Sequence, residues 1–206
     1  MSAIVVGASS GLGLEISKLL ADRGERVIGV SRRSDGDSRV EHVAGDASHA
    51  ETVRRAVAAA GDAGLLINCA GVGVFGGAGS YREEDVRRVV DANLVATILF
   101  CDALFPRFAL HGGTIVNVLS TAATLVKPNE SVYSAAKWGA RGYTEVLRAE
   151  AKGTKARVLA VLPGGMQTPF WSAPREGFLD PRAVAQTILR AIDDPLYVSE
   201  LTILRT

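Results

Sequence analysis

The sequence is poor in the residues that would bind a metal ion, form disulfides or attract polyanions. Only two cysteines, Cys69 and Cys101, occur in 206 residues, and both lie in apolar surroundings. Buried reduced thiols are therefore expected rather than a disulfide, as suits a cytoplasmic protein. The three histidines are scattered without metal-ligand spacing to the cysteines, so no metal site is predicted. A formal net charge of +1 offers no electrostatic reason to expect nucleic acid or an anionic membrane as a partner.

Long apolar runs are also missing. The N-terminus lacks a basic segment followed by a long apolar stretch, and no run reaches the roughly 18 apolar residues that cross a bilayer. Secretion and membrane insertion are thus disfavoured, and a cytoplasmic location is predicted. No Pro/Ser-rich linker divides the chain, so residues 1–206 are interpreted as a single domain with a substantial core.

Short apolar runs, by contrast, recur along the chain and indicate buried strands. They are "AIVV", "RVIGVS", "VEHVAG", "LLIN", "GTIVNVLS", "ARVLAVLP" and "LTILR". Segments with helical periodicity lie between most of them, at residues 12–23, 50–60, 83–110, 131–152 and 181–193. Strands buried on both faces and separated by helices predict an α/β fold of the Rossmann type. This is a doubly wound parallel sheet with helices on both faces, in a three-layer α/β/α sandwich.

The stretch "VGASSGLGLEIS", which starts at Val5, joins the first predicted strand to the first helix. Gly7, Gly11 and Gly13 lie within seven residues of it. Glycines allow positive φ and close backbone approach, and the first helical turn directs unpaired N–H groups toward an anion. The stretch therefore indicates a phosphate site, although such turns also occur in α/β proteins that bind nothing there.

Ligands of doubly wound folds bind beyond the carboxyl ends of the strands, near the point where the strand order reverses. Polar or turn-forming residues follow several predicted strands, and we expect them to converge on one edge of the sheet. A serine at a strand end is otherwise often only a turn former. The residues are Ser31, Arg32, Asp46, Asn68, Ser120, Pro163 and Gly164.

Tyr133 and Lys137 are four residues apart in a predicted helix, so their side chains share one face. An ammonium next to a phenol stabilises the phenolate and lowers the pKa of the tyrosine toward the working range of a general acid. The pair is a candidate proton donor, and a solvated tyrosine–lysine pair is the alternative interpretation.

Taken together, these motifs resemble the short-chain dehydrogenase/reductase family. The matching stretches run in order from Ser2 to about Thr168, and Ser120 precedes Tyr133 by thirteen residues, the usual separation in that family. Two departures occur, at Val6, where threonine is common, and at Cys69, which replaces the usual second asparagine. The matching stretches are "GASSGLG", "GDAS", "NCAG", Asn93, Ser120, "YSAAK" and "PGGMQT".

The resemblance implies roles for four residues. Tyr133 would give a proton to the carbonyl oxygen of a substrate or remove one from an alcohol, and Ser120 would hydrogen-bond the same oxygen. Lys137 would lower the pKa of the tyrosine and bind the nicotinamide ribose, while Asn93 would hold a water that continues the proton relay. The cofactor would supply the hydride, so the protein would orient the reactants and stabilise charge.

The resemblance also implies a dinucleotide along the carboxyl edge of the sheet. The glycine turn would surround the pyrophosphate, Asp46 and Ala47 would contact the adenine, and Thr168 would contact the nicotinamide end. The implied cofactor contacts are Gly7, Ser9, Ser10, Gly11, Leu12, Gly13, Ser31, Arg32, Arg33, Asp46, Ala47, Asn68, Ala70, Gly71, Asn93, Tyr133, Lys137, Pro163, Gly164, Met166 and Thr168.

The end of the second strand bears on the choice between NADP and NAD. NAD sites usually place a carboxylate there to accept a hydrogen bond from the ribose 2′-hydroxyl. Here the sequence reads "GVSRRSD", and Ser31, Arg32 and Arg33 suit a 2′-phosphate. NADP is therefore predicted, with Arg32 as the main contact. In the alternative, the arginines are solvated and Asp35 reaches back to the ribose.

The substrate is expected to be a hydrophobic or aromatic carbonyl compound or its alcohol, because the loops after the fourth to sixth strands carry apolar side chains and little obvious charge. Alternatively, Phe170 and Trp171 only anchor a short helix against the core. The expected lining residues are Phe75, Thr121, Leu125, Met166, Phe170 and Trp171.

A short substrate lid is expected near residues 165–180, and the chain ends earlier than the family commonly does, which favours an open pocket. A homodimer through the two long helices is expected, with a monomer as the alternative. The predicted function is an NADP-dependent carbonyl reductase or alcohol dehydrogenase. A non-catalytic NADP-binding regulator, or a lyase or epimerase using the same site, is the alternative.

Overall fold

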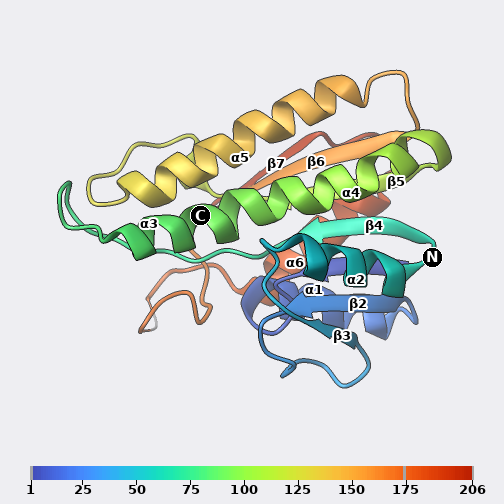
Figure 1. The fold of residues 1–206 in the computed structure, drawn as a ribbon, viewed down its shortest axis with the longest axis horizontal. Helices are drawn as coiled ribbons and strands as arrows, with labels where there is room; N and C mark the ends of the chain where they lie inside the picture. The colour runs from blue at the N-terminus through green and yellow to red at the C-terminus, as the bar shows by residue number, and fades with distance from the viewer. Residues whose placement is uncertain (1, 174, 206) are drawn as a thin grey trace.

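The computed structural model describes residues 2–173 and 175–205, and in them a parallel sheet runs through the molecule (Figure 1). Each strand pairs in parallel with its neighbours, in the order β3-β2-β1-β4-β5-β6-β7. The strands are β1 Ser2–Val6, β2 Arg26–Ser31, β3 Glu41–Ala44, β4 Ala63–Asn68, β5 Gly113–Val118, β6 Ala156–Pro163 and β7 Glu200–Ile203.

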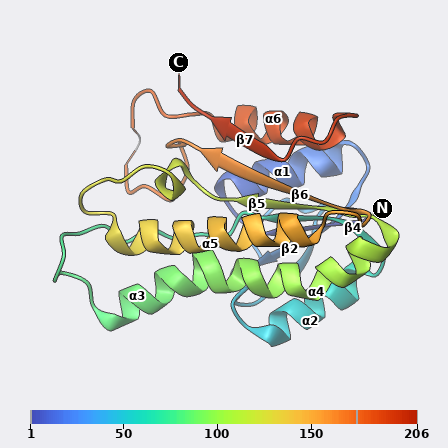
Figure 2. The same ribbon diagram turned by 90° about the horizontal axis from the view of Figure 1, so that it is seen from above.

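Helices cover both faces of this sheet (Figure 2). On one face lie α1 (Gly11–Asp22) and α6 (Pro181–Asp193), and on the other lie α2 (Ala50–Ala60), α4 (Ala96–His111) and α5 (Ser131–Glu150). The predicted three-layer α/β/α sandwich is confirmed.

Alternate side chains of each strand enter different cores, which explains the continuous apolar runs. Ile4 and Val6 of β1 pack with the α4 side chains Phe100 and Phe108 on one face. Val5 of β1 belongs to the core on the other face, which α1 and α6 complete. Because both faces are covered, every residue of β1 is buried.

The predicted helix at 83–110 runs one residue further, to His111, and is not uniform. It begins as α3 (Glu83–Val90), passes through a π-helical stretch (Asp91–Val95) and continues as α4. This helix is long and apolar enough to span a membrane by length and composition alone. Its buried residues Phe100, Leu104 and Phe108 pack against the sheet, which accounts for its apolar character as a core helix.

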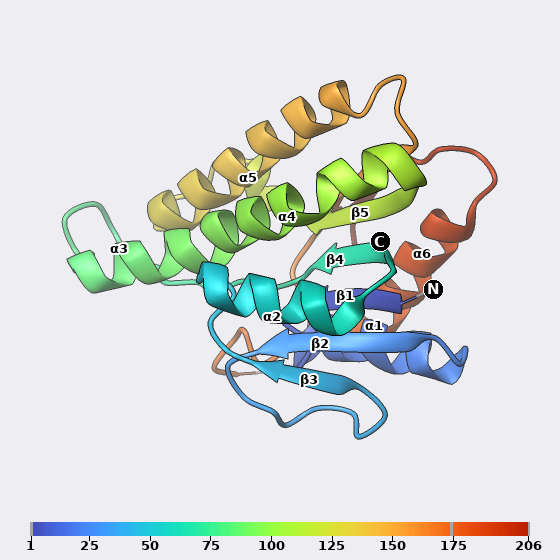
Figure 3. The same cartoon turned by 45° about the vertical axis from the view of Figure 1, so that its right-hand side comes forward.

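The strand order reverses between β1 and β4, which pair side by side in the sheet (Figure 3). The chain builds outward from β1 through β2 and β3, then returns to the other side of β1 to form β4. The connections after β1 and β4 therefore leave the sheet on opposite sides and open a crevice at its carboxyl edge.

Candidate active site

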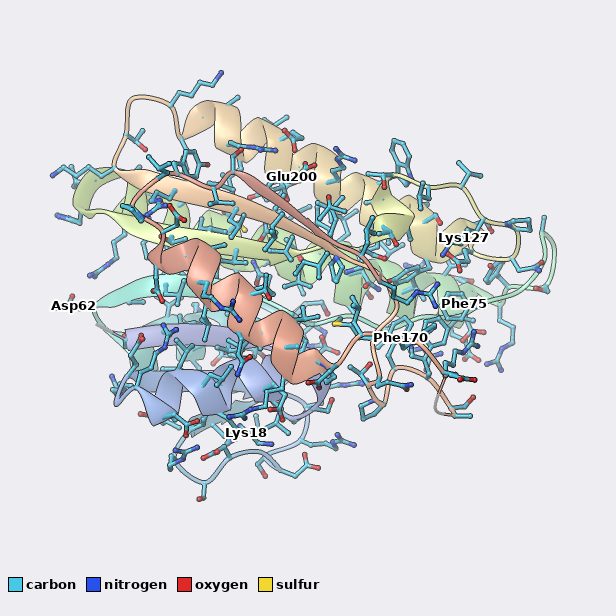
Figure 4. The ribbon with its side chains drawn as sticks, turned by 180° about the vertical axis from the view of Figure 1, so that it is seen from behind. Lys18, Asp62, Phe75, Lys127, Phe170 and Glu200 are labelled. Atoms are coloured by element: carbon cyan, nitrogen blue, oxygen red, sulfur yellow. The ribbon has the colours of Figure 1, made fainter. Side chains whose placement is uncertain are left out.

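A cavity of about 1350 Å³ occupies the carboxyl edge of the sheet. Figure 4 shows Phe75, Phe170 and Lys127 together at this end of the molecule, with Asp62 at the opposite end. The structure brings nearly all the residues predicted from sequence to this cavity. Those that line it are Gly7, Ser9, Ser10, Gly11, Leu12, Gly13, Ser31, Arg32, Arg33, Asp46, Ala47, Phe75, Ala70, Gly71, Asn93, Ser120, Thr121, Tyr133, Lys137, Pro163, Gly164, Met166, Thr168, Phe170 and Trp171.

The glycine turn leaves no room for side chains. Gly7 has a φ of +87°, and its N–H donates to the Val30 carbonyl at 2.7 Å. A Cβ at Gly13 would lie 2.3 Å from the Gly7 carbonyl oxygen, so helix α1 can begin this close to β1 only because residue 13 is glycine. A Cβ at Gly11 would meet the Thr168 side chain at 3.1 Å across the cavity.

The N-terminus of α1 opens into the cavity with its positive end uncapped. Ser10, the N-cap, has an extended backbone, and its side chain makes no capping hydrogen bond. The first helical turn holds no acidic residue. The backbone N–H groups and the helix dipole are therefore oriented to stabilise an anion such as a pyrophosphate.

At the end of β2, basic side chains reach the cavity. Arg33 pairs with Asp35 at 3.1 Å, and Asp35 is not among the residues that line the cavity. Among residues 2–173 and 175–205, Arg32 has no carboxylate partner within 4.0 Å. Its charge nevertheless acts on Asp46. Burial raises the pKa of that carboxyl, but hydrogen bonds from Ser48, followed by the smaller effects of His49 and Arg32, outweigh it, and the net shift is downward.

Two buried groups approach one point beside Gly71. Lys137 is only 5% exposed, and its Nζ donates to the Val118 carbonyl at 3.1 Å. Asn93, 1% exposed, donates from Nδ2 to Val72 and Val89, while its buried Oδ1 has no partner in the described part of the chain. A Cβ at Gly71 would lie 2.7 Å from Asn93 Oδ1 and 3.7 Å from Lys137 Nζ. The acceptor and the ammonium thus flank the same small space.

The expected lowering of the Tyr133 pKa by Lys137 does not appear in the structure. Burial raises the pKa of Tyr133 to about 12, and interaction with Ser120 opposes this only in part. Burial also lowers the pKa of Lys137 to about 8. The lysine Nζ lies 5.9 Å from the centre of the tyrosine ring. The cost of burying charge therefore dominates the pKa of both groups, and neither residue is among the causes of the other's shift, which the sequence spacing alone could not reveal.

The buried lysine predicts a distinct pH dependence of stability. Between pH 8 and the ordinary value of 10.5, the unfolded chain binds the Lys137 proton and the folded chain does not, so the free energy of unfolding rises with pH. Relative to Lys137→Met, wild type should gain about 1.5 kcal/mol between pH 8 and pH 9.5, because the folded chain is still half protonated at pH 8. Urea unfolding of both proteins across this range provides the measurement, and parallel profiles would contradict it.

Two predicted residues lie outside the cavity. Asn68 ends β4, but its amide turns into the core, where Nδ2 donates to Asn117 at 2.8 Å and to the Cys101 sulfur at 3.4 Å. Leu125 is about half exposed on the loop after β5 and does not reach the cavity. Both predictions placed the residue by its position after a strand, whereas the direction of the side chain decides what it contacts.

An aromatic cluster surrounds the tyrosine. The rings of Phe75 and Phe170 each lie 5.6 Å from that of Tyr133. Trp171 stacks on Phe75 at 5.4 Å, with the ring planes 7° apart. Residues 168–173 form turns and bends, so the short helix of the alternative interpretation is absent from this described stretch. Phe170 and Trp171 line the cavity together with Phe75.

Sequence reasoning missed a set of charged and aromatic residues at the outer part of the cavity. Four of them, at positions 84, 87, 88 and 91, lie at helical spacing on α3 and the start of the π-helical stretch, a charge pattern that ordinarily marks only a solvated helix face. The others come from separate segments after β5, β6 and β7, so no local pattern joins them. The missed residues that line the cavity are Glu84, Arg87, Arg88, Asp91, Lys127, Glu130, Arg175, Phe178 and Arg205.

Comparisons with known proteins agree with this geometry. The family model described as short chain dehydrogenase matches residues 1–177. The chain is 31% identical to carbonyl reductase family member 4 of Danio rerio, over 97% of this chain and 94% of the relative. A short chain dehydrogenase from Burkholderia cenocepacia, solved in complex with NADP, is 31% identical, with a TM-score of 0.89 over 98% of this chain and 87% of that one. A short-chain dehydrogenase/reductase from Vibrio parahaemolyticus gives 29% identity and a TM-score of 0.88, covering 99% and 96%.

Proposed function

The chain belongs to the short-chain dehydrogenase family of oxidoreductases, and from this premise we propose that it interconverts a carbonyl compound and its alcohol with NADP(H). The observation that carries the proposal is the convergence of two sets of residues on one cavity. The glycine turn and the uncapped end of α1 lie along one part of it, and Ser120, Tyr133 and Lys137 lie along another.

The cavity has the features that a dinucleotide requires. The turn at Gly7 and Gly13 has no space for a Cβ, so the backbone can approach a pyrophosphate closely. Arg32 offers a guanidinium to a 2′-phosphate. Lys137 Nζ and the unpartnered Asn93 Oδ1 offer a donor and an acceptor to a ribose or a bound water. When bound, the reduced nicotinamide supplies the hydride.

Tyr133 is the proton donor in this proposal. Its pKa of about 12 keeps the phenol protonated at neutral pH, so the group holds the proton that a developing alkoxide needs. Ser120 lies close enough to the phenol to affect its pKa and donates a second hydrogen bond to the same oxygen. In the reverse direction, the tyrosine removes the alcohol proton once ionised, and the Lys137 Nζ lies 5.9 Å from the centre of its ring.

We assign the NADP preference mainly to Arg32. Arg33 is neutralised by Asp35, and that carboxylate lies away from the cavity, which disfavours the NAD-type contact to a 2′-hydroxyl. The Burkholderia cenocepacia relative in complex with NADP supports the same choice.

Arg32→Asp tests this assignment. The variant should lower kcat/KM for NADPH by about 30-fold and shift the NADPH to NADH ratio toward NADH, because it removes one cation and places a carboxylate against the 2′-phosphate. Steady-state kinetics with both cofactors measure the ratio, with Arg54→Gln on α2 as a control for lost surface charge. An unchanged ratio would mean that the 2′-phosphate is recognised elsewhere.

The carbonyl substrate is apolar or aromatic near its reactive end, because Phe75, Phe170 and Trp171 flank Tyr133. Oxidation of NADPH in the presence of ketones, aldehydes and quinones tests the activity, with Tyr133→Phe as the control. Carbonyl-dependent oxidation that disappears in the control supports the proposal. Cofactor binding without turnover of any carbonyl or alcohol would instead favour a regulator, and product formation without net cofactor use a lyase or epimerase.

We also propose that residues 1–206 act as one domain. The two free thiols support a reducing, cytoplasmic compartment for it.

The 165–180 segment serves as a short lid in this proposal. A homodimer through α4 and α5 is proposed because Trp138 and Val146 of α5 remain 49% and 58% exposed.

A further inference from the structure

Arg175 is held in place although it is exposed. The Gln167 side-chain amide makes two hydrogen bonds to the Arg175 backbone. Its Oε1 accepts from the Arg175 N–H at 3.1 Å, and its Nε2 donates to the Arg175 carbonyl. The base of this loop is closed by backbone bonds between Gln167 and Leu179 and between Leu179 and Gly165, both 2.9 Å. The position of Arg175 is therefore set by the fold of the lid.

The guanidiniums of Arg175 and Arg205 both lie near the ring of Phe178. Arg175 stacks on Trp171 at 4.2 Å and lies 5.8 Å from the centre of Phe178, while Arg205, just beyond β7, lies 5.4 Å from Phe178. Both arginines line the cavity. Within residues 2–173 and 175–205, neither has a carboxylate within 4.0 Å.

The aromatic cluster leads from the proton donor to this pair. Phe170 contacts both Tyr133 and Trp171, with ring centres 5.6 and 5.0 Å apart, and Trp171 contacts Phe178 at 5.5 Å. The aromatic rings thus separate the reacting oxygen from two guanidiniums that share the Phe178 ring and have no carboxylate partner within 4.0 Å among the described residues. Such a pair is stabilised by an anion that accepts hydrogen bonds from both.

We propose that the substrate carries an anionic oxygen group, a carboxylate or a phosphate, at the end of its apolar body remote from the carbonyl, bound by Arg175 and Arg205. This rests on the proposed function, because it places the carbonyl at Tyr133. Guanidiniums that only packed on the aromatic rings would give no preference for an anion.

The test uses pairs of ketones that differ in charge. The acids are 4-acetylbenzoate and the longer 4′-acetylbiphenyl-4-carboxylate, each compared with its methyl ester, and 4-acetylphenyl phosphate replaces the carboxylate by a phosphate. The measured quantity is the acid to ester ratio of kcat/KM with NADPH. Replacing both arginines by glutamine should lower this ratio about tenfold, since each exposed pair contributes modestly. The kcat/KM of the phosphate is divided by that of the methyl ester of 4-acetylbenzoate. A phosphate to ester ratio above the acid to ester ratio identifies phosphate as the preferred anion.

Two control proteins separate this effect from misfolding and from net charge. Arg175→Lys with Arg205→Lys keeps both charges and should retain most of the preference. Arg54→Gln with Arg190→Gln removes two charges away from the cavity and should leave the ratio unchanged. An acid to ester ratio that is the same in wild type and in the Arg175→Gln, Arg205→Gln protein would overturn the inference.

A binding measurement distinguishes its failure from that of the proposed function. If wild type reduces the esters but shows no arginine-dependent preference for acids, only the anion site is wrong. If it turns over none of the ketones and none of the corresponding alcohols, the proposed activity fails. Calorimetric titration of 4-acetylbenzoate into the NADP⁺ complex then decides the anion site: weaker binding in the glutamine protein supports it, and equal binding overturns it.

Discussion

Replacing Tyr133 with phenylalanine is expected to lower kcat about 10³-fold while the Kd for NADPH changes by less than about twofold. Only the hydroxyl is lost, and the phenylalanine ring keeps its packing against Phe75 and Phe170. The loss follows from the proposed role of the buried phenol, whose pKa of about 12 keeps it protonated and able to give its proton to the carbonyl oxygen. Stopped-flow or steady-state kinetics give kcat, and fluorescence titration gives the Kd.

Tyr143→Phe is the matched control for this experiment. Tyr143 lies on the same helix, α5, but is not among the cavity-lining residues. Its variant should therefore keep kcat within about twofold of wild type. More than a tenth of wild-type activity remaining in Tyr133→Phe would show that another group donates the proton.

Gly13→Ala is expected to lower the free energy of unfolding by about 3 kcal/mol and to weaken NADPH binding more than tenfold. The new Cβ would lie 2.3 Å from the backbone oxygen of Gly7, and 3.3 Å from the Cys69 Cβ. No rotamer change can relieve an overlap between two backbone-fixed atoms, so α1 must move away from β1. That movement displaces the helix end proposed to hold the pyrophosphate.

The control is a glycine in open space. Gly142 lies in α5 with nothing within 4 Å of its Cβ position. Gly142→Ala should raise the free energy of unfolding by up to about 1 kcal/mol, because alanine favours a helix over glycine. Urea unfolding of both variants and NADPH titration compare the two sites. Similar stability and affinity in both would show that the close contact at Gly13 has little energetic consequence.

The sequence was sufficient where the information is local or periodic. Runs of apolar residues buried on both faces, such as the one around Val5, predict parallel strands covered by helices. The spacing of Gly7, Gly11 and Gly13 predicts the turn, because only glycine tolerates its φ and its close contacts. The four-residue separation of Tyr133 and Lys137 predicts a shared helix face, which follows from helical geometry alone.

Side-chain direction was decided by packing across elements. Asn68 follows a strand as expected but turns into the core toward Asn117, and Leu125 stays outside the cavity. The cations of Arg175 and Arg205 meet on Phe178 although thirty residues separate them in the sequence. No local sequence pattern predicts this contact, because it depends on how the fold places the end of β7 next to the 165–180 loop.

By itself, then, the sequence determined the layer architecture, the glycine turn and the order of the chemical groups along the sheet edge, because each follows from backbone geometry and residue spacing. Only the tertiary structure decided the protonation behaviour of Tyr133 and Lys137 and the charge at the outer end of the cavity. Both depend on burial and on neighbours from distant segments. The free energy of a charge is set by its three-dimensional surroundings, which spacing along the chain does not specify.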